Sequence, residues 1–124
     1  MDYSRTNMRD SEHRLKEMME VSQPDGVMVD PTPITSGQEV TFFYNGLLHK
    51  SGADQVYIHM GYGNNAQWEK TMDIPMAHTQ WGWTKSVTVY DDSRLNFCFK
   101  DSANNWDNNN GSNWSYEIHG GHSH

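Results

Sequence analysis

The sequence has little of what several classes of protein require. Cys98 is its one cysteine, so no disulfide can form within the chain. No apolar run approaches the roughly 20 residues of a membrane-spanning helix. Nine Lys and Arg residues stand against sixteen Asp and Glu, a net charge of −7, and the basic residues are scattered along the chain. Nucleic acids and anionic membrane surfaces need clustered basic side chains, so we expect neither as a partner.

Hydrophobic residues are also scarce. They make up 35% of the 124 residues, below the ~45–50% of typical globular domains. Charged residues are limited to 20%, whereas aromatic residues reach 12%. A chain of this length has room for one domain with one core. A small, flat and aromatic-rich core fits the two layers of a sandwich better than a helical bundle.

Short runs of alternating apolar and polar residues, which are typical of β-strands, begin at residue 26. In one of them Val40, Phe42 and Tyr44 share a face. About seven such runs, with turn signals every eight to twelve residues, predict an all-β fold. We expect an antiparallel β-sandwich with no helix after residue 26. The predicted strands are residues 26–30, 39–45, 55–61, 68–72, 81–90, 95–99 and 113–119.

The two ends of the chain depart from this strand pattern. Residues 1–23 carry charges of both signs, with Leu15, Met18 and Met19 spaced as a narrow helical stripe. So short a stripe buries little surface, which predicts an N-terminal arm that is flexible or forms a short helix. An arm that docks on a partner or on a second copy is the alternative. Residues 24–119 form the predicted module, and residues 120–124 a His-rich tail expected to be solvated.

The loop before the last predicted strand holds Trp106 among Asn, Asp and Gly residues. Hairpin loops are ordinarily polar and exposed, so burial does not explain an indole there. The Asn and Asp residues suggest a calcium loop, but Trp106 would stand at the first ligand position and cannot ligate a cation. An exposed apolar ring among uncharged amides suits a neutral, polyhydroxylated ligand instead.

The other aromatic residues divide by context. Trp68 shares with Trp106 an irregular neighbourhood rich in Asn and Gly, so both are candidate ligand contacts, and His59 opens the loop that leads to Trp68. A pyranose has an apolar C–H face that stacks on an indole and hydroxyl groups that need polar partners. Indoles beside imidazole and amide groups therefore predict a sugar site. Three tryptophans are expected in or beside the core: Trp81, Trp83 and Trp114.

Features of catalysis and of metal sites are missing from the sequence. Carboxylates are present, but none lies in a recognisable catalytic context, and the pair Asp91-Asp92 is ordinary turn chemistry. Nothing near Cys98 is arranged to lower its pKa, so we expect a structural thiol. His119, His122 and His124 could hold Zn²⁺ loosely, but no rigid element is expected to orient them. We predict no catalysis, no cofactor and no resident metal.

The chain resembles the starch-binding modules of carbohydrate-binding module family 25 in three stretches, which occur in the order VYIHMGYGNNAQW, WGWTKSVTV and LNFCFKDSANNWDNNNGSNW. It is also similar to the family 53 modules of plant starch synthases. The likeness runs from about residue 26 to about residue 118. It implies an immunoglobulin-like β-sandwich and non-catalytic binding of α-1,4-glucans, which include starch, glycogen and maltooligosaccharides.

The resemblance also implies which residues bind the sugar. His59, Trp68 and Trp106 match the family's binding platform, in which glucose stacks on exposed tryptophans. Asn108 and Asn109 are the implied partners of its hydroxyl groups. Modules of this kind usually sit beside an amylase-type catalytic domain, so a glucan-active enzyme that acts on the same polymer is an expected partner.

The sequence also leads to expectations about the cellular location of the protein and about an alternative function. The N-terminus shows no signal pattern, which predicts a cytoplasmic protein if that terminus is native. If the chain is excised from a secreted amylase-type enzyme, we expect it outside the cell. The alternative function, from a different class, is a protein-interaction β-sandwich that uses the aromatic patch and the N-terminal arm.

Overall fold

The computed structural model describes residues 26–91 and 93–120. The predicted arm at residues 1–23 and the tail from residue 121 onward lie outside the described residues. No helix within the described ranges is long and apolar enough to cross a membrane.

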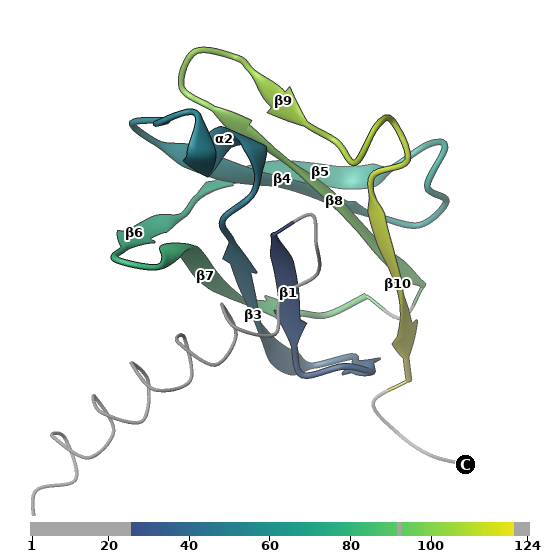
Figure 1. Ribbon diagram of the computed structural model, residues 1–124. Coiled ribbons are helices and arrows are strands. Elements are labelled where there is room, and N and C mark those ends of the chain that lie inside the picture. The colour runs from purple at the N-terminus through teal and green to yellow at the C-terminus, as the bar shows by residue number, and fades with distance from the viewer. Residues whose placement is uncertain (1–25, 92, 121–124) are drawn as a thin grey trace, which may run out of the picture.

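Strands are the main secondary structure of the described residues. One short helix, α2, interrupts the strands between β3 and β4 (Figure 1). The elements are β1 (Val27–Asp30), β2 (Ile34–Thr35), β3 (Gln38–Tyr44), α2 (Leu47–Lys50), β4 (Val56–Tyr62), β5 (Glu69–Pro75), β6 (Ala77–Thr79), β7 (Gly82–Val89), β8 (Arg94–Asp101), β9 (Trp106–Asp107) and β10 (Trp114–His119).

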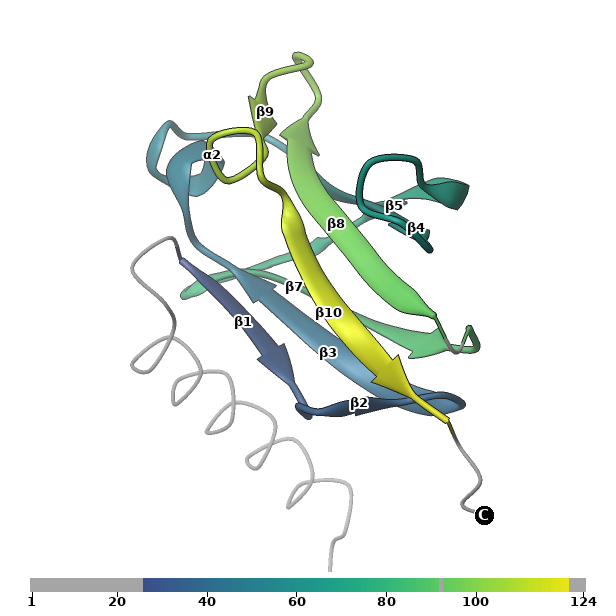
Figure 2. The same cartoon turned by 90° about the vertical axis from the view of Figure 1, so that its right-hand side faces the viewer.

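The strands form two sheets packed face to face. One sheet has the order β1-β3-β7-β6, and the other has the order β2-β10-β8-β4-β5, with β9 paired to β8 beside that path. Every described pair is antiparallel except β2 with β10. Figure 2 shows β8 and β10 in one layer and β3 in the layer behind it. The predicted all-β sandwich is confirmed.

The core fills the space between the layers with aromatic rings. Phe42 and Tyr44 of β3 are fully buried, as the alternation of that strand predicts. Phe42 meets Phe97 of β8 edge-on at 5.2 Å between ring centroids, and Tyr44 stacks on Phe99 at 4.1 Å. Each such side chain contributes about 1.5–3 kcal/mol through burial. A small number of large rings therefore compensates for the low apolar content.

Several details differ from the sequence-based expectation. The connection after β3 contains α2, whose four residues are too few to show a helical period. The strand predicted to end at residue 72 runs on to Pro75 at the sheet edge. Trp81 lies in the turn before β7 and is half-buried, whereas Trp83 is buried as expected. Trp106 belongs to the short strand β9 and not to an irregular loop.

Candidate binding site

Three of the predicted site residues, His59, Trp68 and Trp106, meet on the outer face of the larger sheet. His59 on β4 is opposite Asp73 of β5 on one side and Cys98 of β8 on the other. Two residues earlier on the same face of β4, Tyr57 is opposite Lys100 of β8. These strands thus present imidazole, carboxylate, phenol and ammonium groups on one surface.

The imidazole of His59 lies between the two indoles. Its ring centroid is 5.5 Å from that of Trp68, with the planes inclined by 29°, and 5.3 Å from that of Trp106, with the planes perpendicular. Trp106 is 44% exposed, a large fraction for so apolar a side chain. The structure therefore brings His59, Trp68 and Trp106 into one cluster, which we call the aromatic platform.

Backbone pairing and one buried phenol determine where Trp106 lies. Trp106 is the cross-strand partner of Lys100, and Asp107 is that of Phe99. Asp107 Oδ2 accepts a 2.6 Å hydrogen bond from the Tyr44 hydroxyl, whose oxygen in turn accepts one from the Leu48 amide at 2.9 Å. Burial, followed by the bond to Asp107, raises the pKa of Tyr44 well above its usual value. The phenol stays protonated and ties β9 to the core.

A compact turn positions Trp68. The indole Nε1–H donates to the backbone oxygen and to Oδ1 of Asn65, at 2.9 and 3.1 Å. Asn65 Nδ2 donates to the carbonyl of Ser112 at 3.0 Å, which links this turn to the Asn-rich loop. Gly61 lies beneath, where a Cβ would come within 2.9 Å of Trp68 Cβ. The missing side chain at Gly61 lets the indole approach the sheet closely.

An ionic network supports the platform from the neighbouring strands. Asp73 accepts a hydrogen bond from His59 Nδ1 and pairs with Lys100 Nζ at 2.9 Å. Desolvation alone would raise the pKa of Asp73, but the bonds from His59 and Lys100 outweigh it and lower the pKa. Lys100 Nζ also lies 5.5 Å from the Trp106 ring centroid. Asp73 thereby orients His59 and holds Lys100 beside the indole.

Asp73 and Lys100 are not among the site residues predicted from the sequence. The predicted strand ended at residue 72, one position before the carboxylate that is opposite His59. Lys100 was counted among scattered basic residues, because its proximity to Trp106 depends on the hairpin between β8 and β9. If the predicted strand had been extended past residue 72, Asp73 would have been expected opposite His59.

Asn108 and Asn109 already hold the loop together. Asn108 Oδ1 accepts from the Gly111 amide at 3.0 Å, and Asn109 Nδ2 donates to the Asn113 carbonyl at 3.1 Å. Asn109, Asn110 and Asn113 have φ values of 57°, 57° and 59°, in the left-handed region that Asn tolerates better than most residues. Some of the asparagines in this loop therefore stabilise its backbone conformation. The predicted contact of Asn108 and Asn109 with sugar hydroxyls stays a prediction.

Cys98 lies in the sheet beneath this surface. It is buried, and burial, followed by the nearby carboxylates of Asp73 and Asp107, raises the pKa of its thiol to about 12. A thiol with so high a pKa stays protonated and is a poor nucleophile. Within the described ranges, no cluster of three or more His, Cys, Asp or Glu side chains is arranged to hold a metal ion.

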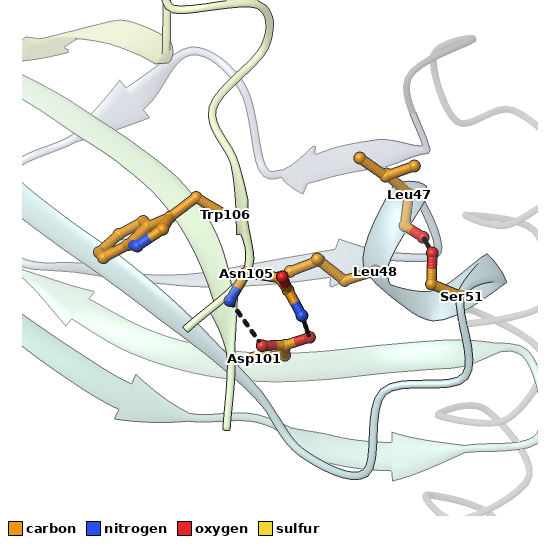
Figure 3. A pocket seen from close by; sticks show the side chains of 6 residues that line it. All are labelled: Leu47, Leu48, Ser51, Asp101, Asn105 and Trp106. Atoms are coloured by element: carbon orange, nitrogen blue, oxygen red, sulfur yellow. Dashed lines mark hydrogen bonds between the residues drawn. The ribbon is translucent and has the colours of Figure 1, made fainter. Parts of the chain in front are cut away.

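A hollow of about 330 Å³ lies between Trp106 and α2 (Figure 3). Its polar groups are largely engaged. The Asp101 carboxylate accepts from the amide of Ala103 and from the amide and side chain of Asn105, at 2.8–3.0 Å. The bond from the Asn105 side chain is the first cause of the lowered pKa of Asp101. The lining residues are Leu47, Leu48, Ser51, Asp101, Asn105 and Trp106.

Together the fold and the site define a class of protein. A β-sandwich that offers clustered indoles and an imidazole on an outer sheet face, with hydrogen-bonding groups beside them, is built to bind a carbohydrate.

Comparison with known proteins supports this class. Residues 40–97 match the model of the starch/carbohydrate-binding module of family 53. A stretch of 88 residues, 69% of this chain, is 33% identical to part of an alpha-amylase of Clostridium acetobutylicum and covers 11% of that protein. The chain thus spans about a tenth of the length of this relative. No solved structure matches this chain. The resemblance to starch-binding modules is confirmed.

Proposed function

We propose that the module binds α-1,4-glucans by stacking adjacent glucose units on Trp68 and Trp106, with His59 between them. The contact of His59 with both indoles is the observation that carries this proposal. Trp68 comes from the turn before β5 and Trp106 from the strand β9, so their planes can differ and follow a curved chain. The match to a starch-binding family supports a glucan as the ligand.

The polar groups of the platform suit the hydroxyl edges of such a sugar. Within the described residues, His59 bonds through Nδ1 to Asp73, and no bond is made through Nε2. That nitrogen lies on the ring that contacts both indoles and is available to bond a sugar hydroxyl group. A neutral ligand implies an affinity little affected by salt. We expect dissociation constants between micromolar and millimolar, about −8 to −4 kcal/mol.

The carboxylates near the platform support binding without catalysis. Asp73, Asp101 and Asp107 are each bonded to neighbouring groups of the protein. The pKa values of Asp73 and Asp101 are lowered, whereas a general acid needs a raised one. We further propose that a glucan-active enzyme is the partner, acting on the same polymer that the module holds. The alpha-amylase relative supports this arrangement.

Calorimetric titration with maltoheptaose tests the proposal. We expect favourable heat, with binding weakened more than tenfold in Trp106→Ala because the stacking surface is lost. Tyr90→Ala is the matched control, since Tyr90 is 79% exposed and makes no ring contact with the platform. Absence of heat at millimolar sugar would overturn the proposal. Flow-through from amylose resin would then favour the protein-interaction function, and release of reducing sugar from starch would indicate an enzyme.

A further inference from the structure

A second hollow, of about 340 Å³, adjoins the platform on the same outer face. Its lining residues are Tyr57, Asp73, Lys100, Asp101, Ser102 and Asn104. Its volume is at the lower end of the ~300–1,000 Å³ range of small-molecule sites, which leaves room for about one sugar unit. None of these residues belongs to the aromatic platform.

The hollow and the platform share a continuous wall. Lys100 Nζ lies 5.5 Å from the Trp106 ring centroid and 5.8 Å from that of Tyr57, so it bridges the two rings. Asp73 lines the hollow and is bonded to His59 of the platform. A chain that leaves the Trp106 ring along this face therefore meets Tyr57 and Lys100 next.

Three of the side chains that line this hollow have free hydrogen-bonding capacity. Tyr57, Ser102 and Asn104 make no side-chain hydrogen bond within residues 26–91 and 93–120. Asn104 projects from a turn at φ 63°, held by the bond from its amide to the Asp101 carbonyl at 3.1 Å. In the hollow beside α2, by contrast, the side chains of Ser51 and Asn105 already have partners. Hydroxyl, amide and phenol groups without partners are what a sugar needs.

The charges of this hollow favour a neutral ligand. Lys100 is paired with Asp73 at 2.9 Å, which cancels its charge. Asp101, with a lowered pKa, adds a second carboxylate to the wall. A phosphate ester would be repelled, whereas sugar hydroxyls can donate to these carboxylates and accept from the ammonium group.

We propose that this hollow is a third sugar subsite, in which Tyr57, Ser102 and Asn104 bind the glucose unit that follows the two on the platform. The proposal rests on the α-glucan function proposed above. With this subsite, the affinity of the module depends on the length of the glucan. A disaccharide occupies the platform alone, and a trisaccharide or longer chain gains the additional contacts.

Titrations with maltose and maltotriose, side by side, test the subsite. For the unaltered chain we expect maltotriose to bind about two- to tenfold more tightly, the range that one or two hydrogen bonds supply. The double variant Tyr57→Phe/Asn104→Gly should lose this gain and keep its affinity for maltose. Phe retains the ring, and Gly accepts the positive φ of residue 104.

Leu47→Ala is the control, because Leu47 lines only the hollow beside α2. It should keep the gain for maltotriose. The subsite is overturned if the double variant keeps the gain, if it weakens maltose and maltotriose equally, or if Leu47→Ala removes the gain. Tighter binding of a phosphorylated maltotriose would overturn the assignment to a neutral sugar. Failure of the unaltered chain to bind either sugar would instead reject the α-glucan function.

Discussion

The Tyr44 hydroxyl donates a hydrogen bond to Asp107 across 63 positions of sequence, and this bond connects the core to the site. Tyr44 is fully buried between the sheets, and Asp107 directly follows Trp106. The same hydroxyl oxygen accepts from the Leu48 amide of α2. One phenol therefore joins β3, α2 and β9, and it limits where the indole of Trp106 can lie.

Tyr44→Phe tests this connection. We expect a loss of about 1–3 kcal/mol in the free energy of unfolding, because the Leu48 amide loses its acceptor and Asp107 its donor. Maltoheptaose binding should weaken as well, since Trp106 is held less firmly. Denaturant unfolding and calorimetry measure the two effects. Tyr90→Phe, at an exposed position, should change neither. Unchanged stability in Tyr44→Phe would contradict the role given to the phenol.

Asp73→Asn tests whether this carboxylate positions His59. The amide keeps the size of the side chain but loses the charge that pairs with Lys100 and orients the imidazole. We expect about two- to tenfold weaker maltoheptaose binding with a nearly unchanged thermal melt. Glu69→Gln, an exposed change on the same strand, serves as the control. Equal effects of the two variants would show that only net charge matters.

Acid should weaken the fold through Asp101. The bonds from Asn105 and Ala103 keep the pKa of this carboxyl below its unfolded value of about 3.9. A lowered folded-state pKa means that the stabilisation is complete above about pH 4 and is lost as pH falls through the folded value. In Asp101→Asn, melting temperatures should be lower than those of the unaltered chain near pH 6, and the difference should shrink as pH falls below the unfolded value. A constant difference at all pH values would contradict this.

Gly61→Ala tests the close approach of Trp68 to the sheet. The added Cβ would lie 2.9 Å from Trp68 Cβ and 3.0 Å from Thr71 Cγ2, closer than such contacts allow. We expect a loss of about 1–3 kcal/mol in stability and weaker glucan binding, because the indole must shift away from His59. Indole fluorescence, unfolding and maltose titration report the change. Full retention of binding would show that the position of Trp68 is not critical.

Sequence reasoning identified the fold class through alternation. Val40, Phe42 and Tyr44 recur with period two, and all three are buried. It did not find α2, β2, β6 or β9, because two to four residues are too few to establish a period. Trp106 was singled out for the right reason, its exposure, but in the wrong local structure: it lies on a short strand and not in an irregular loop.

By itself the sequence determined the all-β sandwich, the resemblance to starch-binding modules and the three rings of the platform, since each depends on local pattern and residue type. Only the tertiary structure decided that Asp73 bonds to His59, that Lys100 lies against Trp106 and that Tyr44 reaches Asp107. These contacts depend on strand register and on the packing of one sheet against the other. A shift of one residue in register would place each partner on the opposite face of its sheet.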